Sequence, residues 1–379
     1  MKSYNHLYEQ YISDENYDLA VCNATKHKGG KKRKFRKAQY YKQHKDELKP
    51  KLLHYASHFY NMKHTPKEIY DGIRRKKRVI IVPSMPEQIV HHMVVNVMKP
   101  IILKPMYEHA YGSLPNRGAT KGSGRHNSKT KGGKEAIEKF LRDHPKDAKY
   151  CLKMDIHKFF DSVPHDKLKA MFREIIHDER FLKVLETIVD ANGKEVGMPI
   201  GFYTSQWFAN FYLTPLDHYI KETLGAEAYY RYMDDMVIFG SNKRKLHEMR
   251  RKIDVFLNDE LGLEMNPKWQ VFRFEYTKRT GKTVGRHLDF MGFRFHRERT
   301  VLRRTLMLRA TRKARRICRK FRKTIYDCRQ MLSYKGWLTP TATYGMYRKY
   351  IKPFVSFRNL RKYMGRFQRR ENRRALCGT

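Results

Sequence analysis

The chain has 379 residues, of which 81 are Lys or Arg and 38 are Asp or Glu, so its formal net charge is +43. This excess is far larger than solubility requires, and it predicts a polyanionic partner. With 25 Tyr and 21 Phe among the charges, nucleic acid is favoured over a membrane, because bases stack on aromatic rings while phosphates bind Lys and Arg. A ribosomal-type or chaperone-like RNA binder is the alternative that charge alone leaves open.

The sequence carries no signal for a membrane or for export. No run reaches the roughly 18 apolar residues of a membrane span, and Met1 to Asn5 lack the apolar core of a signal peptide. The five cysteines are scattered without a paired C-x-x-C, which argues against a zinc module and against a disulfide framework. We therefore expect a cytoplasmic protein with no membrane partner.

The N-terminal part is predicted to be helical and basic. Apolar residues recur at helical spacing in residues 4–20 and 47–62, and a basic run from Lys26 to Lys37 lies between them. We expect this run to be a mobile arm that contacts phosphate, although a solvated loop explains it equally well. Five cations, Arg74 to Arg78, then lead into a short strand over residues 79–82, and residues 85–103 have the pattern of a buried helix.

A strand predicted over residues 149–155 ends at Asp155. Pro164 and Asp166 signal a helix soon after it, so the Asp155 carboxylate is expected at a strand end. Phe160 follows five residues later. Taken alone, Phe160 is best explained as a core residue.

Two adjacent carboxylates, Asp234 and Asp235, lie between segments rich in aromatic and β-branched residues, which predicts a β-hairpin with the pair at its tip. Neighbouring strand side chains point to opposite faces, so the two carboxylates reach one point only if a tight turn bends the backbone. Such a pair needs a cation, and carboxylate oxygens suit Mg²⁺ or Mn²⁺. A solvated Asp-Asp turn is the alternative.

The segment Tyr232-Met233-Asp234-Asp235 resembles the catalytic box of reverse transcriptases, and Asp155 matches the first catalytic aspartate of that family. Seventy-nine residues separate Asp155 from Asp234, so only the fold could bring them together. The resemblance implies RNA-templated DNA synthesis, with two Mg²⁺ ions, or Mn²⁺ as a substitute, at the reacting groups. The residues implied are the catalytic Asp155, Asp234 and Asp235, with Ile156 as a further metal ligand.

The resemblance also implies a nucleotide site. Arg78 matches a fingers residue that holds the incoming triphosphate, which Arg can bind in bidentate fashion. Phe160 matches the ring that blocks a ribose 2′-hydroxyl, which implies deoxynucleoside triphosphates as substrates. Leu114 replaces the arginine of the second fingers motif, so Arg117 is the candidate for that role. Lys268 is the candidate to protonate pyrophosphate, and Tyr232 and Met233 are further predicted substrate contacts.

A variant motif suggests a subtype. Most reverse transcriptases have Gln-Gly, three residues, then Ser-Pro, whereas this chain has Ile200-Gly201 and Ser205-Gln206. The variant resembles the reverse transcriptases of diversity-generating retroelements, which copy a template RNA with errors at adenines. An aliphatic side chain in place of an amide would remove hydrogen bonds that could reject a mispair. Ile200, Gly201 and Gln206 are therefore predicted substrate contacts, and the subtype implies a small basic accessory protein as a partner.

The resemblance implies an α+β right-hand polymerase of fingers, palm and thumb, with an antiparallel palm sheet. Beyond Thr300, one apolar stripe from Ala310 to Ile325 runs along a basic surface and predicts a helical thumb that grips a template–primer duplex through phosphates. Residues 288–295 resemble the primer grip of the family. The expected organisation is a helical basic extension at 1–73, fingers at 74–150, a palm at 151–298, and a thumb with a basic tail at 299–379.

Two other functions remain open. A retron, group II intron or defence-type reverse transcriptase would keep the three aspartates and differ in its RNA partner. A non-catalytic RNA-binding protein would keep the charge, but it would have no reason to keep Asp155, Asp234 and Asp235 together with Phe160.

Overall fold

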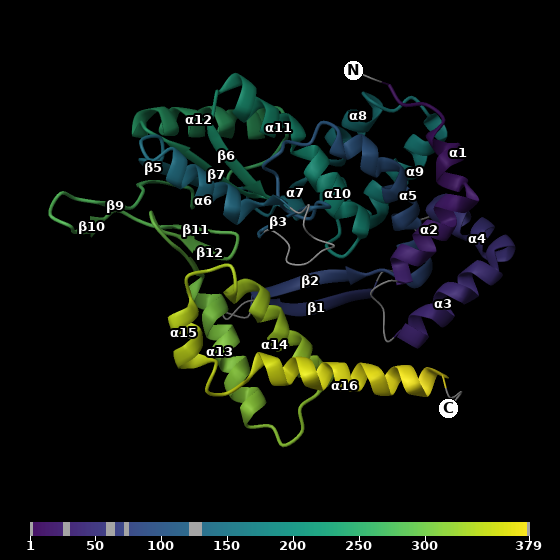
Figure 1. Cartoon of the computed structure of the whole chain (residues 1–379). Coiled ribbons are helices and arrows are strands. Elements are labelled where there is room, and N and C mark those ends of the chain that lie inside the picture. The colour runs from purple at the N-terminus through teal and green to yellow at the C-terminus, as the bar shows by residue number, and fades with distance from the viewer. Residues whose placement is uncertain (1–2, 26–30, 58–64, 72–75, 121–130, 377–379) are drawn as a thin grey trace.

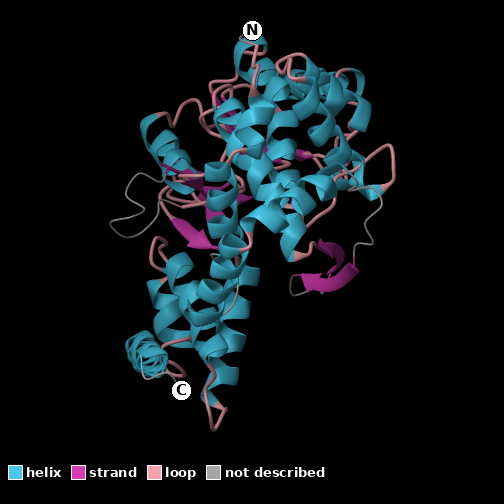
Figure 2. Cartoon of the chain, turned by 90° about the vertical axis from the view of Figure 1, so that its right-hand side faces the viewer, coloured by secondary structure: helices cyan, strands magenta, loops and turns pink. Residues whose placement is uncertain are grey.

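The computed structural model describes residues 3–25, 31–57, 65–71, 76–120 and 131–376. A helical body surrounds the central sheet, and a bundle of helices from the C-terminal part lies below that body in Figure 1. The hairpin of β1 (Thr65–Asp71) and β2 (Lys76–Val82) projects from the same side of the body as this bundle in both views (Figures 1 and 2). The described residues therefore form the predicted α+β fold, with a palm, fingers and a helical basic thumb.

The palm sheet has four antiparallel strands in the order β6-β7-β5-β8. Its two faces follow the alternation of the sequence: Leu152 and Met154 belong to one core cluster, while Cys151 belongs to another. Helix α12 (Lys243–Asp259) packs on the first face, and α6 (Gly133–Asp143) contributes to the second. The strands are β5 (Tyr150–Asp155), β6 (Ala228–Tyr232), β7 (Asp235–Gly240) and β8 (Gln270–Arg273).

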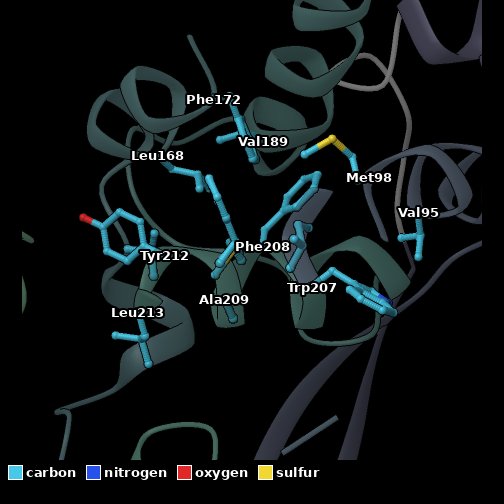
Figure 3. Packing of buried hydrophobic residues seen from close by; sticks show 14 of the residues in the cluster. Val95, Met98, Leu168, Phe172, Val189, Trp207, Phe208, Ala209, Tyr212 and Leu213 are labelled. Carbon is cyan, nitrogen blue, oxygen red and sulfur yellow. The ribbon is translucent and has the colours of Figure 1, made fainter. Parts of the chain in front are cut away.

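The helix predicted over residues 85–103 is confirmed as α5 (Met85–Leu103). It begins at a capping box, in which the Ser84 side chain accepts from the Glu87 N–H while the Glu87 carboxylate accepts from the Ser84 N–H. α5 packs against α2 and α10 (Tyr203–Tyr212), and Figure 3 shows Val95 and Met98 beside Trp207 and Phe208 of α10. The fingers and the palm are therefore joined through one hydrophobic core.

The N-terminal part is helical, as predicted, and residues 31–37 of its basic run belong to a helix rather than to an arm. The contact with phosphate that we expect of this run stays a prediction. Residues 31–43 form helix α3, whose backbone is regular, and residues 26–30 lie outside the described residues. Lys and Arg have good helix propensity, and α3 packs against α2 and α4, so the run continues a helical layer. The helices are α1 (Leu7–Ile12), α2 (Asp14–Thr25), α3 (Lys31–Gln43) and α4 (Lys45–Ser57).

The fingers contain an antiparallel hairpin of β1 (Thr65–Asp71) and β2 (Lys76–Val82). The predicted domain boundary between residues 73 and 74 therefore separates two strands that pair with each other. The sequence did not indicate β1, because its residues show no strong alternation of apolar and polar side chains. Arg74 and Arg75 of the predicted cation run lie outside the described residues.

Short helices complete the fingers and the palm. They are α7 (Phe159–Ser162), α8 (His165–Arg173), α9 (Glu179–Val189), the 3₁₀ turn η3 (Asp190–Asn192), α11 (Thr214–His218) and the π-helical turn η4 (Tyr219–Thr223). Two-residue strands β3 (Arg117–Gly118) and β4 (Lys131–Gly132) pair in parallel.

A second sheet follows the palm. The strand pair predicted at 288–295 is confirmed as β11 and β12, joined by a turn at Met291 and Gly292, both of which have positive φ. A Cβ on Gly292 would lie 3.0 Å from atoms of both Leu306 and Trp337, so the turn packs closely on the thumb. The three strands of this sheet are β11 (Leu288–Phe290), β12 (Phe293–Phe295) and β13 (Thr300–Leu302). A separate antiparallel hairpin precedes it and consists of β9 (Tyr276–Thr277) and β10 (Thr283–Val284).

The thumb is helical, but the single apolar stripe predicted from Ala310 to Ile325 is wrong. Helix α13 ends at Cys318, and Phe321, which the stripe included, is 98% exposed. Thr324 and Asp327 form a capping box that begins a new helix, so the local capping signal overrides the apolar spacing. The helices are α13 (Arg304–Cys318), α14 (Ile325–Leu338), α15 (Tyr344–Tyr350) and α16 (Phe357–Leu376).

Among the described residues, no helix combines the length and the apolar composition that crossing a membrane requires. The expected cytoplasmic location stays a prediction.

Candidate active site

The two adjacent carboxylates lie at the tip of a hairpin, as predicted. Strand β6 ends at Tyr232, which pairs with Asp235 at the start of β7, so only Met233 and Asp234 form the turn. Met233 has a φ of 56°, a left-handed conformation that a side-chain-bearing residue adopts only where its surroundings enforce it. The turn thereby places Asp234 beyond the ladder and Asp235 within it.

The third carboxylate lies directly beside this turn. Asp155 is the last residue of β5, and it pairs with Asp235 across the antiparallel ladder. Asn266 fixes it from the other side: its side-chain N–H donates to Asp155 Oδ2 at 2.9 Å, and its backbone N–H donates to the Asp155 carbonyl at 2.8 Å. Asp155, Asp234 and Asp235 therefore gather at one end of the palm sheet.

Two of the carboxylates at this end of the sheet have raised pKa values, although cationic side chains lie nearby. Burial, with a smaller contribution from the neighbouring charges of Asp235 and Asp155, raises the pKa of Asp234 to about 6. Burial also raises the pKa of Asp235, whose Oδ1 lies 4.0 Å from Lys153 Nζ. Lys153 donates instead to the Asp289 carbonyl at 2.8 Å. Clustered, partly buried carboxylates of this kind fit a hard divalent cation, which would relieve their repulsion.

A buried ion pair between Arg231 and Asp217 contacts the backbone of the turn. The guanidinium of Arg231 and the carboxylate of Asp217 are both fully buried, and Arg231 donates from Nε to Oδ1 at 2.7 Å and from Nη2 to Oδ2 at 2.6 Å. The remaining nitrogen, Nη1, donates to the Met233 carbonyl at 3.2 Å. The same guanidinium thus joins α11 to the strained residue of the turn.

Asn210 extends this network to the fingers. Its side-chain oxygen accepts from Arg231 Nη1 at 3.0 Å, and its Nδ2 donates to the Gly112 carbonyl at 3.0 Å. A Cβ on Gly112 would lie 2.6 Å from Met233 Cγ and from Met233 N, so only glycine allows the turn to approach. Sequence reasoning missed Arg231, Asp217, Asn210 and Asn266, although an Arg inside an apolar strand signals a buried partner.

The variant motif at Ile200 and Gly201 contacts the fingers hairpin through its backbone. The Ile81 N–H of β2 donates to the Ile200 carbonyl at 2.7 Å. Gly201 has a φ of 124°, and a Cβ there would lie 1.9 Å from the Ile81 carbonyl oxygen. The glycine is therefore required for the hairpin to dock, whereas the hydrogen bond of Ile200 is made by its backbone and does not depend on its side chain.

The side chains of Ile200 and Phe160 line one cavity. Its volume is about 530 Å³, and Val79 and Ile81 of β2 form another part of its wall. Phe160 is half-buried, and its carbonyl accepts from the Met198 N–H at 2.6 Å. Two residues predicted to contact the substrate are thus brought together from segments 40 positions apart in the sequence.

The other predicted site residues differ in their placement. Arg78 is exposed on β2, and its charge lowers the pKa of Asp234, which opposes part of the effect of burial. Arg117 Nη1 donates to the Tyr107 carbonyl, so part of that guanidinium supports the backbone. Gln206 and Lys268 are exposed, and the Lys268 N–H donates to Asn266 Oδ1 at 3.1 Å. The functional roles of these residues stay predictions.

Comparison with known proteins identifies the sequence family of the chain. Residues 63–295 match the sequence family described as Reverse transcriptase (RNA-dependent DNA polymerase). A segment of 85 residues is 38% identical to an uncharacterized 91 kDa protein in cob intron of Schizosaccharomyces pombe, and it covers 20% of this chain and 10% of that protein. The chain therefore spans about a tenth of the length of this curated relative.

Solved structures of telomerases resemble the chain distantly. Apo telomerase from Candida tropicalis has a TM-score of 0.46 and 14% identity, covering 71% of this chain and 51% of that one. Telomerase from Candida albicans in complex with a TWJ fragment of telomeric RNA has a TM-score of 0.42 and 13% identity, covering 74% and 57%. The chain spans about half the length of these telomerase chains.

The Asp217→Asn variant tests the buried ion pair. The substitution keeps the shape of the side chain but leaves the Arg231 guanidinium buried without a counter-charge, so we expect a loss of about 3–5 kcal/mol in the free energy of unfolding. Urea unfolding followed by far-UV circular dichroism measures this loss. Glu222→Gln, which removes an exposed partner of His218, should cost less than about 1 kcal/mol. Equal losses in the two variants would contradict a special role for the buried pair.

The Asp234→Asn variant tests the repulsion at the turn. The folded-state pKa of Asp234 is above its unfolded value, so ionisation favours unfolding, and the stability of the wild type falls as the pH rises from about 4 towards 6. Without divalent ions, the variant should therefore melt at a higher temperature than the wild type at pH 7.5, and the gain should vanish near pH 4. Thermal unfolding at each pH measures this, with Asp143→Asn as an exposed control. A pH-independent gain would contradict the electrostatic cause.

Proposed function

Because the chain belongs to the reverse transcriptase (RNA-dependent DNA polymerase) family, we propose that it copies an RNA template into DNA at the carboxylate cluster of the palm. The observation that carries this proposal is the pairing of Asp155 with Asp235 at the sheet end, where the turn adds Asp234. Three carboxylates from two distant segments converge there, which a solvated turn would not require.

The chemistry requires divalent ions that these carboxylates are suited to hold. Asp155, Asp234 and Asp235, with Ile156 beside them, would hold two Mg²⁺ ions, with Mn²⁺ as a substitute. When bound, such ions lower the pKa of a primer 3′-hydroxyl and neutralise the charge of departing pyrophosphate. Asn266 orients Asp155 through two hydrogen bonds, and Arg231 keeps the turn in the conformation that presents Asp234. The protein thus contributes positions fixed before substrate binds.

The surrounding residues suit a deoxynucleoside triphosphate paired with a template. Arg78 projects from the fingers hairpin and acts electrostatically at Asp234, as expected of a residue that meets the triphosphate near the metals. Phe160 lines the cavity beside β2, where its ring would meet the ribose and exclude a 2′-hydroxyl. Exposed arginines of α13, among them Arg312, Arg315 and Arg316, would hold the phosphates of a template bound to an RNA or DNA primer.

The subtype we favour is a diversity-generating retroelement enzyme, error-prone at template adenines. Support comes from Ile200, which lines the cavity together with Phe160. Its side chain is aliphatic and has no amide group that could form a hydrogen bond there. A mispair would meet fewer directional hydrogen bonds in such a cavity than beside a glutamine. This subtype brings with it a small basic accessory protein as the expected partner.

A second candidate is an intron-associated reverse transcriptase. The curated relative is named as a protein in a cob intron, and the 85 matching residues are 38% identical. This alternative keeps the same carboxylates and the same reaction and changes the RNA that is copied. It predicts faithful copying at every template base.

Substitution of the catalytic carboxylates tests the activity. Asp155→Asn and Asp235→Asn should each reduce primer extension on an RNA template with deoxynucleotides and Mg²⁺ to below about one hundredth, because each removes charge that the ions require. Affinity for the template–primer should change by less than about twofold, since the basic surfaces are intact. Asp143→Asn is the matched exposed control. Synthesis that persists in the Asn variants would overturn the assignment.

Sequencing of the extension products separates the two subtypes. The retroelement proposal expects errors concentrated opposite template adenine, and expects Ile200→Gln to reduce them roughly tenfold by restoring an amide near the new base pair. Val196→Gln, which adds an amide elsewhere on the same cavity, should leave the error pattern unchanged. Uniformly accurate copying by the wild type would contradict the retroelement subtype and favour the intron-type enzyme.

A further inference from the structure

Three metal-ligating side chains meet at the base of the β9–β10 hairpin, outside the carboxylate cluster. Glu275 directly precedes β9, His287 directly precedes β11, and His296 directly follows β12. The nitrogen and oxygen atoms that they offer all lie within 4.8 Å of one another. The reverse transcriptase reaction proposed above uses none of these residues.

The geometry of the cluster is compact. Glu275 Oε2 lies 2.7 Å from His296 Nδ1, and the imidazole rings of His287 and His296 face each other with centroids 5.0 Å apart and planes tilted by 33°. The Glu275 and His296 side chains are 15% and 21% exposed, so both are largely buried but accessible from solvent. A carboxylate and two imidazoles form a donor set that suits Zn²⁺ and similar borderline ions.

The backbone holds the three residues in place. The Glu275 N–H donates to the Arg286 carbonyl at 3.1 Å, and the Arg286 N–H donates to the Arg273 carbonyl at 3.0 Å, which joins the segments before His287 and Glu275. The His296 N–H donates to the Arg299 carbonyl at 2.9 Å. The ligands therefore need side-chain adjustment only, and little conformational entropy is lost when an ion binds.

A hydrogen bond between Glu275 and His296 explains part of this cluster but not all of it. Among the described residues, the His287 side chain makes no hydrogen bond, yet its ring lies against that of His296. Charged neighbours are present on both sides, with Arg294 and Asp289 beside His287. Arg297 donates from its backbone N–H to Glu275 Oε1 at 3.4 Å and from Nε to the Glu275 carbonyl at 3.1 Å, which leaves Oε2 on the side of the histidines. A divalent cation would give a role to all three side chains.

We propose that Glu275, His287 and His296 form a zinc-type transition-metal site with one coordination position left for water. Ligands bound at about 2.0 Å around a tetrahedral ion lie about 3.3 Å apart, so Glu275 and His296 would separate by roughly half an ångström. The ion would join the hairpin base to the sheet that packs on the thumb. The proposal does not depend on polymerase activity.

The test uses Co²⁺ as a spectroscopic probe on the full chain, stripped of metal by a chelator and held in excess Mg²⁺ so that the aspartate cluster is occupied. We expect one equivalent of Co²⁺ to give the visible absorption of a tetrahedral or five-coordinate site, and Zn²⁺ to displace it. His287→Ala and His296→Ala should each weaken binding at least about tenfold, while His177→Ala, an exposed histidine elsewhere, should not.

Two further readouts keep the result decisive. Binding through the exposed Cys22 or Cys318 would produce thiolate-to-cobalt absorption in the near ultraviolet, and its presence would overturn the proposal. Zn²⁺ should raise the melting temperature of the wild type and of the His177→Ala control, but not that of His287→Ala. Far-UV circular dichroism checks that His287→Ala is folded. Absence of saturable Co²⁺ binding by the wild type, or equal binding by all variants, would also overturn it.

Discussion

The ion pair between Arg231 and Asp217 is the interaction on which the geometry of the site depends. The pair is fully buried, which costs free energy because two charges lose their hydration. Hydrogen bonds from every nitrogen of the guanidinium to its partners offset this penalty. One of these partners is the carbonyl of Met233, whose left-handed backbone forms the turn. A buried charge pair has few alternative arrangements, so it specifies one conformation for the turn more strictly than apolar packing would.

The palm sheet extends this local restraint to the three carboxylates at its end. Antiparallel pairing places Asp155 opposite Asp235, and Asn266 holds Asp155 from the neighbouring segment. Burial is the main cause that raises the pKa of Asp234 and of Asp235, and the nearby charge of Asp155 acts on both in the same direction. Carboxylates that repel one another therefore lie at the end of the sheet, and the hydrogen-bond network of Arg231 stabilises the turn that carries Asp234.

The fingers and the thumb are joined to this centre by close backbone contacts. Gly201 allows β2 to approach the segment after α9, and Gly292 allows the second sheet to approach the thumb. The cavity shared by Phe160 and Ile200 exists because the hairpin docks there. Specificity for the sugar and tolerance of mispairs would thus both depend on the position of β2, which a substitution at Gly201 would disturb without touching either side chain.

The sequence by itself determined the elements whose signals are local. Alternation and apolar spacing located the hairpin around Asp234 and the helix at 85–103, and the order of motifs indicated a reverse transcriptase. Tertiary structure alone decided which distant residues meet: Asn266 with Asp155 across 111 positions, Arg231 with Asp217, and His287 with His296 and Glu275. It also decided that the thumb stripe breaks before α14. Periodicity reports which face of an element is buried, whereas the partner on that face depends on chain topology, which no local pattern encodes.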